Sequence, residues 1–456
     1  MWTAWTRSLI GARPGEGRAT VLSGLHFFLI LFSYFLVRPV REAMGVQRGL
    51  DELTWLFTLT LFVMVGANAV YALCASRMRR SLLQASVHRF FALTLLAFAG
   101  LLLIVPDVIG VRVGYAFYVW VSVFNLFIVS TFWAFMADGF RHDQAKRLFP
   151  PIAIGGTLGA IAGSSFTRTF AEELGPLWLM VGSAVLLECS LRVARMLDRR
   201  DFVEVEDLDP STPERVPAEQ PIRGGALRGL MLVSRSPYLM LICGYIGLLA
   251  IGSTLLYFTQ ARIVTDAADE TNARIALFAN IDLWTQIATL ALQAFVTGRL
   301  LRGVGVGPML VTLPVILLVG FAALAMAPAT AAYSVLVLFN AAFRSGKYAI
   351  ARPARETLFT VVTREEKYKA KTLLDTAVYR GGDFLGAQVF GLLAGATAVT
   401  LGGVALLAAV VAGVWGGCGV AIAILLGRRV ARPSDPARGS HATPGAELQP
   451  PATATG

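Results

Sequence analysis

Two copies of one charged motif lie within long apolar stretches of this 456-residue chain. Residues 34–45 read YFLVRPVREAMG and residues 348–359 read YAIARPARETLF, so each copy has a tyrosine, three apolar residues and then Arg-Pro-x-Arg-Glu. On a helix, the two arginines of a copy share one face with the glutamate that follows them. Guanidinium groups bind carboxylates and phosphates in a bidentate manner. The motif therefore indicates recognition of an anionic solute.

Two further cations, Arg344 and Lys347, precede the second copy and lie deeper in the apolar stretch. Charged side chains within membrane-spanning segments usually face a cavity and mark a substrate or ion pathway. The alternative for arginines near helix ends is that they snorkel to the lipid headgroups. We favour the cavity. The predicted substrate-binding residues are Arg38, Arg41, Arg344, Lys347, Arg352 and Arg355.

Acidic residues in or beside the apolar stretches form a second group of candidates. Such a carboxylate could pair with an arginine when the substrate is absent, or carry a coupling proton. A basic loop, KYKAK at residues 367–371, precedes one of them, and Lys371 lies on the same helical face as Asp375, four residues later. The predicted gating or coupling residues are Glu42, Glu356, Asp138, Asp282, Lys369, Lys371, Asp375, Arg380 and Asp383.

Other kinds of chemistry find no support in the residue pattern. The four cysteines are separated from one another and from any histidine cluster, so we expect neither a metal site nor a disulfide framework. No Gly-x-x-x-x-Gly-Lys-Ser/Thr sequence occurs, which argues against an ATP-driven pump. No nucleophile–base pairing indicates an enzyme, and we expect no cofactor.

Membrane-spanning helices are the elements predicted to hold these charges. Hydrophobic residues make up 56% of the chain and charged residues 15%, against about 25% charged in a typical soluble domain. The apolar residues form continuous blocks of about 20, which cross a bilayer as helices, and they lack the alternation of a β-barrel. We expect an all-α membrane protein with about twelve spans, at 21–44, 53–75, 87–106, 114–137, 150–171, 175–197, 237–259, 274–298, 306–327, 331–358, 372–394 and 398–427.

The net charge of +11 follows from membrane topology rather than from nucleic-acid binding. Basic residues concentrate on the cytoplasmic side of membrane proteins, and most basic residues outside the spans fall on one side if both termini are cytoplasmic. We therefore expect a multi-pass protein of the inner (plasma) membrane, in contact with the lipid bilayer and not with nucleic acid. The loops assigned to the outside hold only Arg48, Arg112, Arg168, Arg262 and Arg274.

The predicted spans fall into two groups of six, separated by a polar segment rich in charge, proline and glycine. The tail is rich in Pro, Ala, Gly and Thr and is expected to be disordered. The expected organisation is a cytoplasmic segment at 1–20, six-helix bundles at 21–197 and 237–427, a flexible cytoplasmic linker at 198–236 and the tail at 428–456.

Short similarities relate the two halves. FNLF at 124–127 corresponds to FNAAF at 339–343, and the segment 141–163 corresponds to 365–387, each with a basic loop before a Gly-Gly pair. Two six-span halves related in this way are the plan of major facilitator transporters. In that plan the first and tenth spans line the central cavity, so both copies of the charged motif fall on cavity helices.

Two stretches resemble signatures of the ATP/ADP antiporter family of nucleotide transporters. SYFLVRPVREAMGV at 33–46 is similar to its first-span motif, in which Arg-x-x-Lys-Asp follows an aromatic residue. EEKYKAKTLLDTAVYRGGD at 365–383 is similar to a second signature, Lys-Phe-Lys-Gly-Lys followed by Ile-Asp. The resemblance covers roughly residues 20–427 and implies exchange of nucleotides through a twelve-helix carrier.

We interpret the chain as a secondary transporter, expected to be a monomer, that moves a small organic anion by alternating access. A nucleotide or another phosphorylated metabolite is the best substrate hypothesis. The alternatives are a proton-coupled major facilitator exporter of another solute and a membrane sensor or scaffold without transport. The two Arg-Pro-x-Arg-Glu copies are predicted to form paired gates, one near each mouth, because the first and tenth spans run in opposite directions.

Overall fold

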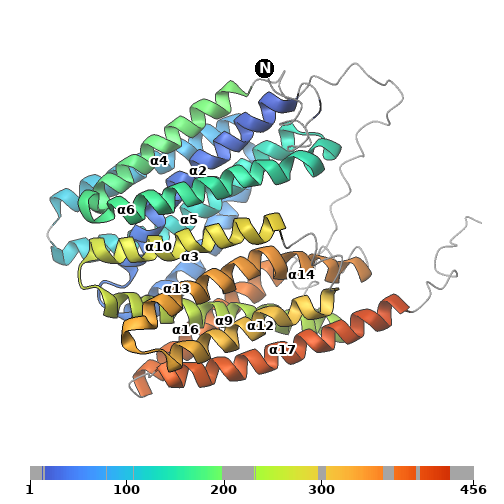
Figure 1. The fold of residues 1–456 in the computed structure, drawn as a ribbon. Coiled ribbons are helices and arrows are strands. Elements are labelled where there is room, and N and C mark those ends of the chain that lie inside the picture. The colour runs from blue at the N-terminus through green and yellow to red at the C-terminus, as the bar shows by residue number, and fades with distance from the viewer. Residues whose placement is uncertain are drawn as a thin grey trace, which may run out of the picture.

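The computed structural model describes residues 13, 16–78, 80–105, 107–197, 231, 233–295, 305–362, 374–396 and 401–431. Every regular element within these ranges is a helix (Figure 1). Most of the predicted linker and tail lies outside the described residues, as do Lys369 and Lys371. The α-helices are α2 Glu16–Gly45, α3 Leu50–Arg77, α4 Arg80–Ile104, α5 Asp107–Gly139, α6 His142–Met196, α9 Pro237–Ala267, α10 Thr271–Phe295, α12 Val306–Met326, α13 Ala329–Gly346, α14 Arg352–Leu358, α16 Tyr379–Ala396 and α17 Leu401–Ala431.

Among the described residues, nine helices are long and apolar enough to cross a membrane. The longest, α6, breaks at Gly175, whose φ of 65° belongs to the left-handed region that favours glycine, and Pro176 follows it. The predicted spans 150–171 and 175–197 are therefore the two limbs of α6. Where their residues are described, the remaining predicted spans also coincide with helical segments, so this part of the chain has the all-helical fold expected from the apolar blocks.

Two π-helical segments interrupt the α-helices of the second half of the chain. Lys347–Ala351 forms the π-helix η1 between α13 and α14, and Leu374–Val378 forms η3, which leads into α16. Pro353 explains the first of these, because a proline ring clashes with the carbonyl group four residues earlier, here that of Ala349, and has no N–H to donate. The wider π-helical turn at Lys347–Ala351, just before the proline, relieves this clash.

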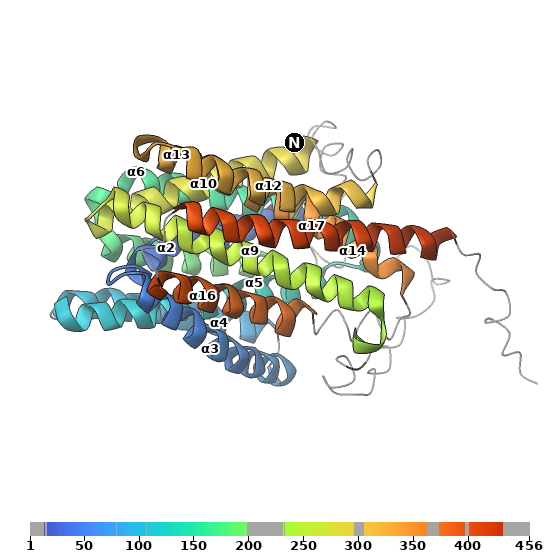
Figure 2. The same cartoon turned by 90° about the horizontal axis from the view of Figure 1, so that it is seen from below.

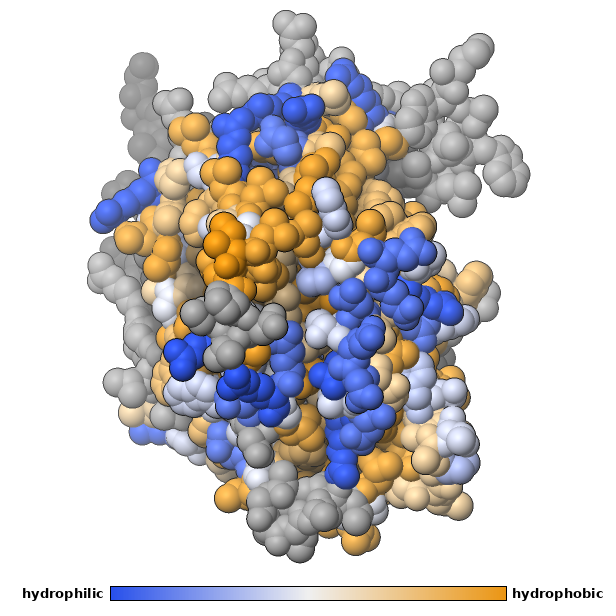
Figure 3. Space-filling view, turned by 90° about the vertical axis from the view of Figure 1, so that its left-hand side faces the viewer, coloured by the Kyte–Doolittle hydropathy of each residue, from blue (hydrophilic) through white to orange (hydrophobic). Residues whose placement is uncertain are grey.

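The helices α2 to α6 form one group and α9 to α17 form the other. In Figure 1, α2, α4, α5 and α6 lie in the upper part, α3 and α10 in the middle, and the other helices of the second group below them. Contacts between these two groups come from α10, which packs against α2 and α6, and from α3, which packs against α16 and α9 (Figures 1 and 2). The start of α2 and the end of α17 lie at the same end of the molecule. Figure 3 views the opposite end, where α9 turns into α10, and shows hydrophilic residues gathered in patches among apolar ones.

Glycines bring α2 and α6 into direct backbone contact. A Cβ atom on Gly155, Gly159 or Gly163 of α6 would meet the carbonyl oxygens of Gly24, Phe28 and Phe32 of α2, respectively. Small residues spaced by four allow helix backbones to approach in membrane proteins. The sequence GGTLGAIAG at residues 155–163 lies inside α6, which begins at His142, and it lets α2 lie against α6 along several turns.

The same arrangement recurs between α9 and α16. A Cβ atom on Gly382 of α16 would meet the carbonyl oxygen of Gly247, and one on Gly386 would meet Thr254 and the backbone of Ile251. These glycines belong to the segment that corresponds in sequence to the glycines of α6. The similarity between the halves thus reflects one helix-packing contact used twice.

We expect Gly159→Leu to destabilise the fold, because overpacking a tight contact costs about 1–3 kcal/mol. The matched control is Gly100→Leu in α4, where an added Cβ meets nothing within 4 Å. Thermal unfolding of the purified proteins in detergent measures the difference. An equal loss of stability in the two variants would contradict the packing role of Gly159.

Candidate functional site

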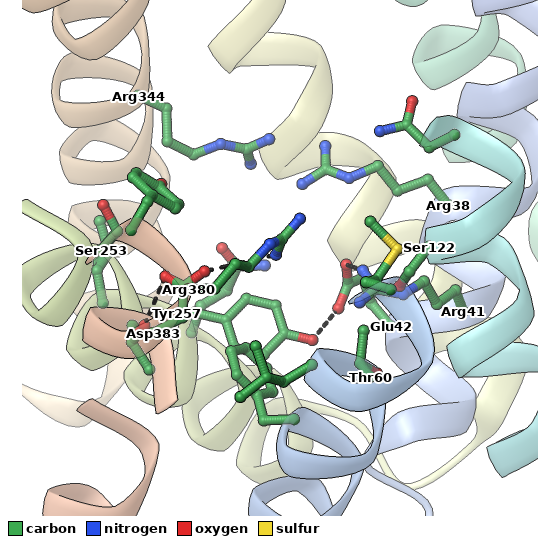
Figure 4. A pocket seen from close by; sticks show the side chains of 18 of the residues that line it. Arg38, Arg41, Glu42, Thr60, Ser122, Ser253, Tyr257, Arg344, Arg380 and Asp383 are labelled. Atoms are coloured by element: carbon green, nitrogen blue, oxygen red, sulfur yellow. Dashed lines mark hydrogen bonds and ion pairs between the residues drawn. The ribbon is translucent and has the colours of Figure 1, made fainter. Parts of the chain in front are cut away.

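A cavity of about 400 Å³, called the central cavity below, lies between the two groups of helices. Its wall comes from α2, α3 and α5 on one side and from α9, α13, η1 and α16 on the other. Figure 4 shows Arg38 and Arg344 reaching toward one another across it. Among its lining residues cations outnumber carboxylates. The charged lining residues are Arg38, Arg41, Arg344, Lys347, Arg380, Glu42 and Asp383.

One buried carboxylate holds two of these arginines. Arg38 Nη1 lies 2.5 Å and Arg344 Nη1 lies 2.8 Å from the same oxygen, Oδ1 of Asp282 on α10. The Asp282 side chain is 4% exposed, so it depends on these partners. A buried charge that loses its partner costs about 3–5 kcal/mol. Arg38 belongs to α2, whereas Asp282 and Arg344 belong to α10 and α13. The ion pair between Arg38 and Asp282 therefore joins the two groups of helices.

A second cluster surrounds Glu42. Arg41 Nη1 donates a hydrogen bond to Glu42 Oε1 at 2.7 Å, and the hydroxyl of Tyr257 donates to Glu42 Oε2 (Figure 4). The Arg41 guanidinium also lies over the ring of Tyr118, 4.0 Å from its centroid, and the hydroxyls of Tyr118 and Tyr257 are 2.9 Å apart. Since Tyr257 belongs to α9, this cluster links α2 to the other group of helices a second time.

The far side of the central cavity carries the remaining charges. Lys347 Nζ donates to the hydroxyls of Tyr379, at 2.6 Å, and Ser253, at 3.3 Å. Asp383 lies 3.5 Å from Arg380 Nη1 and accepts a hydrogen bond from Thr254 at 3.3 Å. Both of these hydrogen bonds from Lys347 go to neutral hydroxyls, which leave its charge available to an anion.

A second cavity of about 270 Å³ adjoins the first. It shares Lys347, Tyr348 and Tyr379 with the central cavity and adds Arg352 and Arg355 of α14. The six predicted substrate-binding cations are therefore divided between two cavities. Three of them line only the central cavity, two line only the second cavity, and Lys347 lines both.

The predicted gating and coupling residues have different locations. Glu42, Arg380 and Asp383 line the central cavity, and Asp282 is buried behind its arginines. Asp138 was expected to be buried, but it is exposed at the end of α5, where the helix leaves the apolar region. Of the others, Glu356 is exposed and lies 3.9 Å from Arg355, whereas Asp375 falls within η3.

Sequence reasoning missed the tyrosines and amides of the central cavity. Tyr118 and Tyr257 stand next to other aromatic residues, Phe117 and Phe258, in apolar sequence and carried no signal of their own. Asn125 and Asn340 both line the cavity, and they are the asparagines of the corresponding FNLF and FNAAF segments. Equivalent positions in the two halves were therefore a usable signal for cavity residues.

Comparison with known proteins gives one sequence relative and several similar structures. No protein-family model matches the chain. The "ADP,ATP carrier protein 1" of Chlamydia pneumoniae is 21% identical over 304 residues, which cover 60% of this chain and 59% of that relative. The chain thus matches less than two thirds of the length of this relative.

Two solved structures show the likeness in fold. A variant of the nucleoside transporter NupG has a TM-score of 0.54 at 16% identity, with 91% of this chain and 99% of that chain covered. The peptide transporter POT in complex with sulfate has a TM-score of 0.59 at 13% identity, with 93% and 98% covered. The described helices and these similarities establish that the chain is an all-α membrane protein with the major facilitator fold.

Proposed function

We propose that this protein is a secondary transporter that carries an organic anion across a membrane by alternating access. The observation that carries the proposal is the surplus of cations in the central cavity, which lies between two groups of helices. Charged groups within a membrane protein are costly and commonly mark a transport pathway. An anionic solute would supply the missing negative charge.

A nucleotide or another phosphorylated metabolite is the substrate class that we propose. Arginine binds phosphate groups bidentately, and partly exposed tyrosines of the cavity such as Tyr257 and Tyr379 offer aromatic faces for a base beside the cations. The name of the chlamydial relative and the two antiporter-like motifs support this choice, with nucleotide exchange as its most specific form. Uptake of labelled nucleotides and phosphate esters by proteoliposomes tests it, and the absence of uptake for the whole panel would reject it.

The shared carboxylate suggests how the substrate could change the conformation. In the structure Asp282 neutralises Arg38 and Arg344, one from each group of helices. A phosphate that binds both arginines would replace this carboxylate as their partner. The link between the groups of helices would then run through the solute, so that its binding and release affect how the halves are held together.

Topology and assembly belong to the same proposal. The excess of basic residues on one side supports an inner (plasma) membrane location with both termini in the cytoplasm. We further propose two six-helix domains, joined by the 198–236 linker and acting as a monomer. The groups of helices in Figure 1 and the glycine contacts repeated in each group support the two domains.

Proton-coupled export of another solute is the second candidate. Asp383 favours it, because this carboxylate lies in the central cavity within reach of Arg380 and Thr254. A change in its protonation would alter the charge next to the solute. Transport driven by an imposed pH gradient would support this candidate, whereas uptake that depends only on a counter-solute would support exchange.

We expect Arg41→Gln and Lys347→Gln each to weaken binding of the transported anion by about tenfold or more, because loss of a desolvated charge pair costs about 2–5 kcal/mol. Arg112→Gln is the control, since Arg112 is exposed at the surface. Binding of the substrate found in the uptake panel is measured by calorimetry. Similar affinities for all three variants would contradict a cationic binding site.

The paired-gate hypothesis gives a further expected outcome. Arg38 and Glu42 bond to Asp282 and Tyr257 of the other group of helices, whereas Glu356 lies near Arg355 of its own helix. Neutralising Arg38 and Glu42 together should remove the outer links and favour the outward-open state. The matched Arg352→Gln/Glu356→Gln double variant should favour the inward-open state.

Accessibility of introduced cysteines from each side of the membrane measures this shift. The hypothesis requires the two double variants to change accessibility in opposite directions. A shift toward the same side, or none in either variant, would leave snorkelling to the headgroups as the better account of the motif.

A further inference from the structure

The second cavity has the composition of an anion-binding site of its own. Its lining comprises three cations, three tyrosines and two apolar residues: Lys347, Arg352, Arg355, Tyr245, Tyr348, Tyr379, Leu249 and Ala351. No carboxylate lines it among the described residues, although Glu356 approaches Arg355 from outside. Arg352 is exposed at its rim, so an anion can reach it from solvent.

The boundary between the cavities is formed by Lys347, Tyr348 and Tyr379, which line both, and it contains one hydrogen-bonded pair. Lys347 and Tyr379 line both cavities, and their Nζ and hydroxyl oxygen are 2.6 Å apart. Lys347 is the first residue of the π-helix η1, and Tyr379 directly follows the π-helix η3. π-Helical segments are rare and occur frequently at functional sites. Here two of them meet at the contact that separates the cavities.

The second cavity lies toward one end of the transport path. α14 carries Arg352 and Arg355, and it lies at the end of the molecule where α2 begins and α17 ends (Figures 1 and 2). The central cavity extends in the other direction along α2, to Arg41 and Glu42. A solute that moves between the second cavity and the central cavity passes Lys347, Tyr348 and Tyr379, which line both.

We propose that the second cavity is a separate binding site for the phosphate-bearing group of the transported solute, with Lys347 as the cation shared by both sites. Arg352 and Arg355 bind the phosphate on one side of the Lys347–Tyr379 pair, and Arg38, Arg41 and Arg344 bind it on the other. Lys347 stays in contact with the phosphate while the phosphate moves from one cavity to the other, because Lys347 lines both cavities. This inference rests on the proposed transport of an organic anion and adds a second binding site to the transport path.

Calorimetric titration of the full-length protein in phospholipid-free detergent tests the inference, with inorganic pyrophosphate as the probe. We expect two binding events in the unchanged protein. Arg352→Gln/Arg355→Gln should weaken one event by about tenfold or more and leave the other, whereas Arg41→Gln should do the reverse. Arg428→Gln, which changes an exposed arginine at the end of α17, is the matched control and should alter neither.

Arg352→Gln alone provides a second variant, because this exposed side chain can change with little risk to folding. It should weaken the same event as the double variant. A single event in the unchanged protein, or two events unaffected by either variant of α14, would overturn the second site. If that single event were lost in Arg41→Gln, the proposed function would stand. Failure of pyrophosphate to bind at all would count against both.

The phosphate of an anionic lipid headgroup is the other source of the same chemistry. The titration is therefore repeated with phosphatidylglycerol added to the detergent. We expect both pyrophosphate events to persist. Selective loss of the event that depends on Arg352 and Arg355 would assign the second cavity to lipid and overturn its role for the solute.

Discussion

An arginine buried among apolar helices must find a counter-charge, and the centre of this molecule is arranged around that requirement. Asp282 supplies the counter-charge for both Arg38 and Arg344, with a single carboxylate oxygen between the two guanidinium groups. Glu42 supplies it for Arg41, with support from the hydroxyl of Tyr257. Each solution uses residues from both groups of helices. The charges that suit the cavity to an anion are thus also the links between its two walls.

Close helix packing places these charges opposite one another. The glycines of α6 let α2 lie directly against it, and Gly382 and Gly386 do the same for α16 against α9. Each contact fixes a cavity helix to a neighbour within its own group. Between the groups, the ion pairs and hydrogen bonds of Asp282 and Glu42 add to the packing of α10 on α2 and α6 and of α3 on α16 and α9. These polar links can exchange one partner for another when an anion enters the cavity.

Tyrosines give the cavity neutral partners for its cations. The hydroxyl of Tyr379, which lines both cavities, accepts a hydrogen bond from Lys347, and the hydroxyl of Ser253 accepts another. A phenol hydroxyl can satisfy a donor without cancelling its charge. Cations held in this way keep their attraction for a phosphate. The partly exposed rings of Tyr257 and Tyr379 in the central cavity also offer aromatic faces for a nucleotide base, so that neighbouring residues could bind both parts of the proposed substrate.

The sequence by itself determined the membrane class, the helices and the charged candidates, because these depend on local properties. A block of about 20 apolar residues favours a membrane helix whatever surrounds it. The prediction of a break between spans at 171–175 follows equally from local signals, and Gly175 forms it. The repeated motif drew attention to Arg38 and Arg41, and the depth of Arg344 and Lys347 in apolar sequence indicated a cavity.

Only the tertiary structure decided which charges meet. Arg38 and Asp282 lie 244 residues apart in the sequence, and their pairing depends on how α2 and α10 are rotated against one another. The orientation of the helices also determines which cavity each predicted cation lines and brings Tyr257 to Glu42. Asp138 is exposed because it lies at the end of α5. Hydropathy and helical periodicity specify a helix and its faces, but not the neighbour that each face will contact. That choice is the sum of many small packing contacts across the whole bundle.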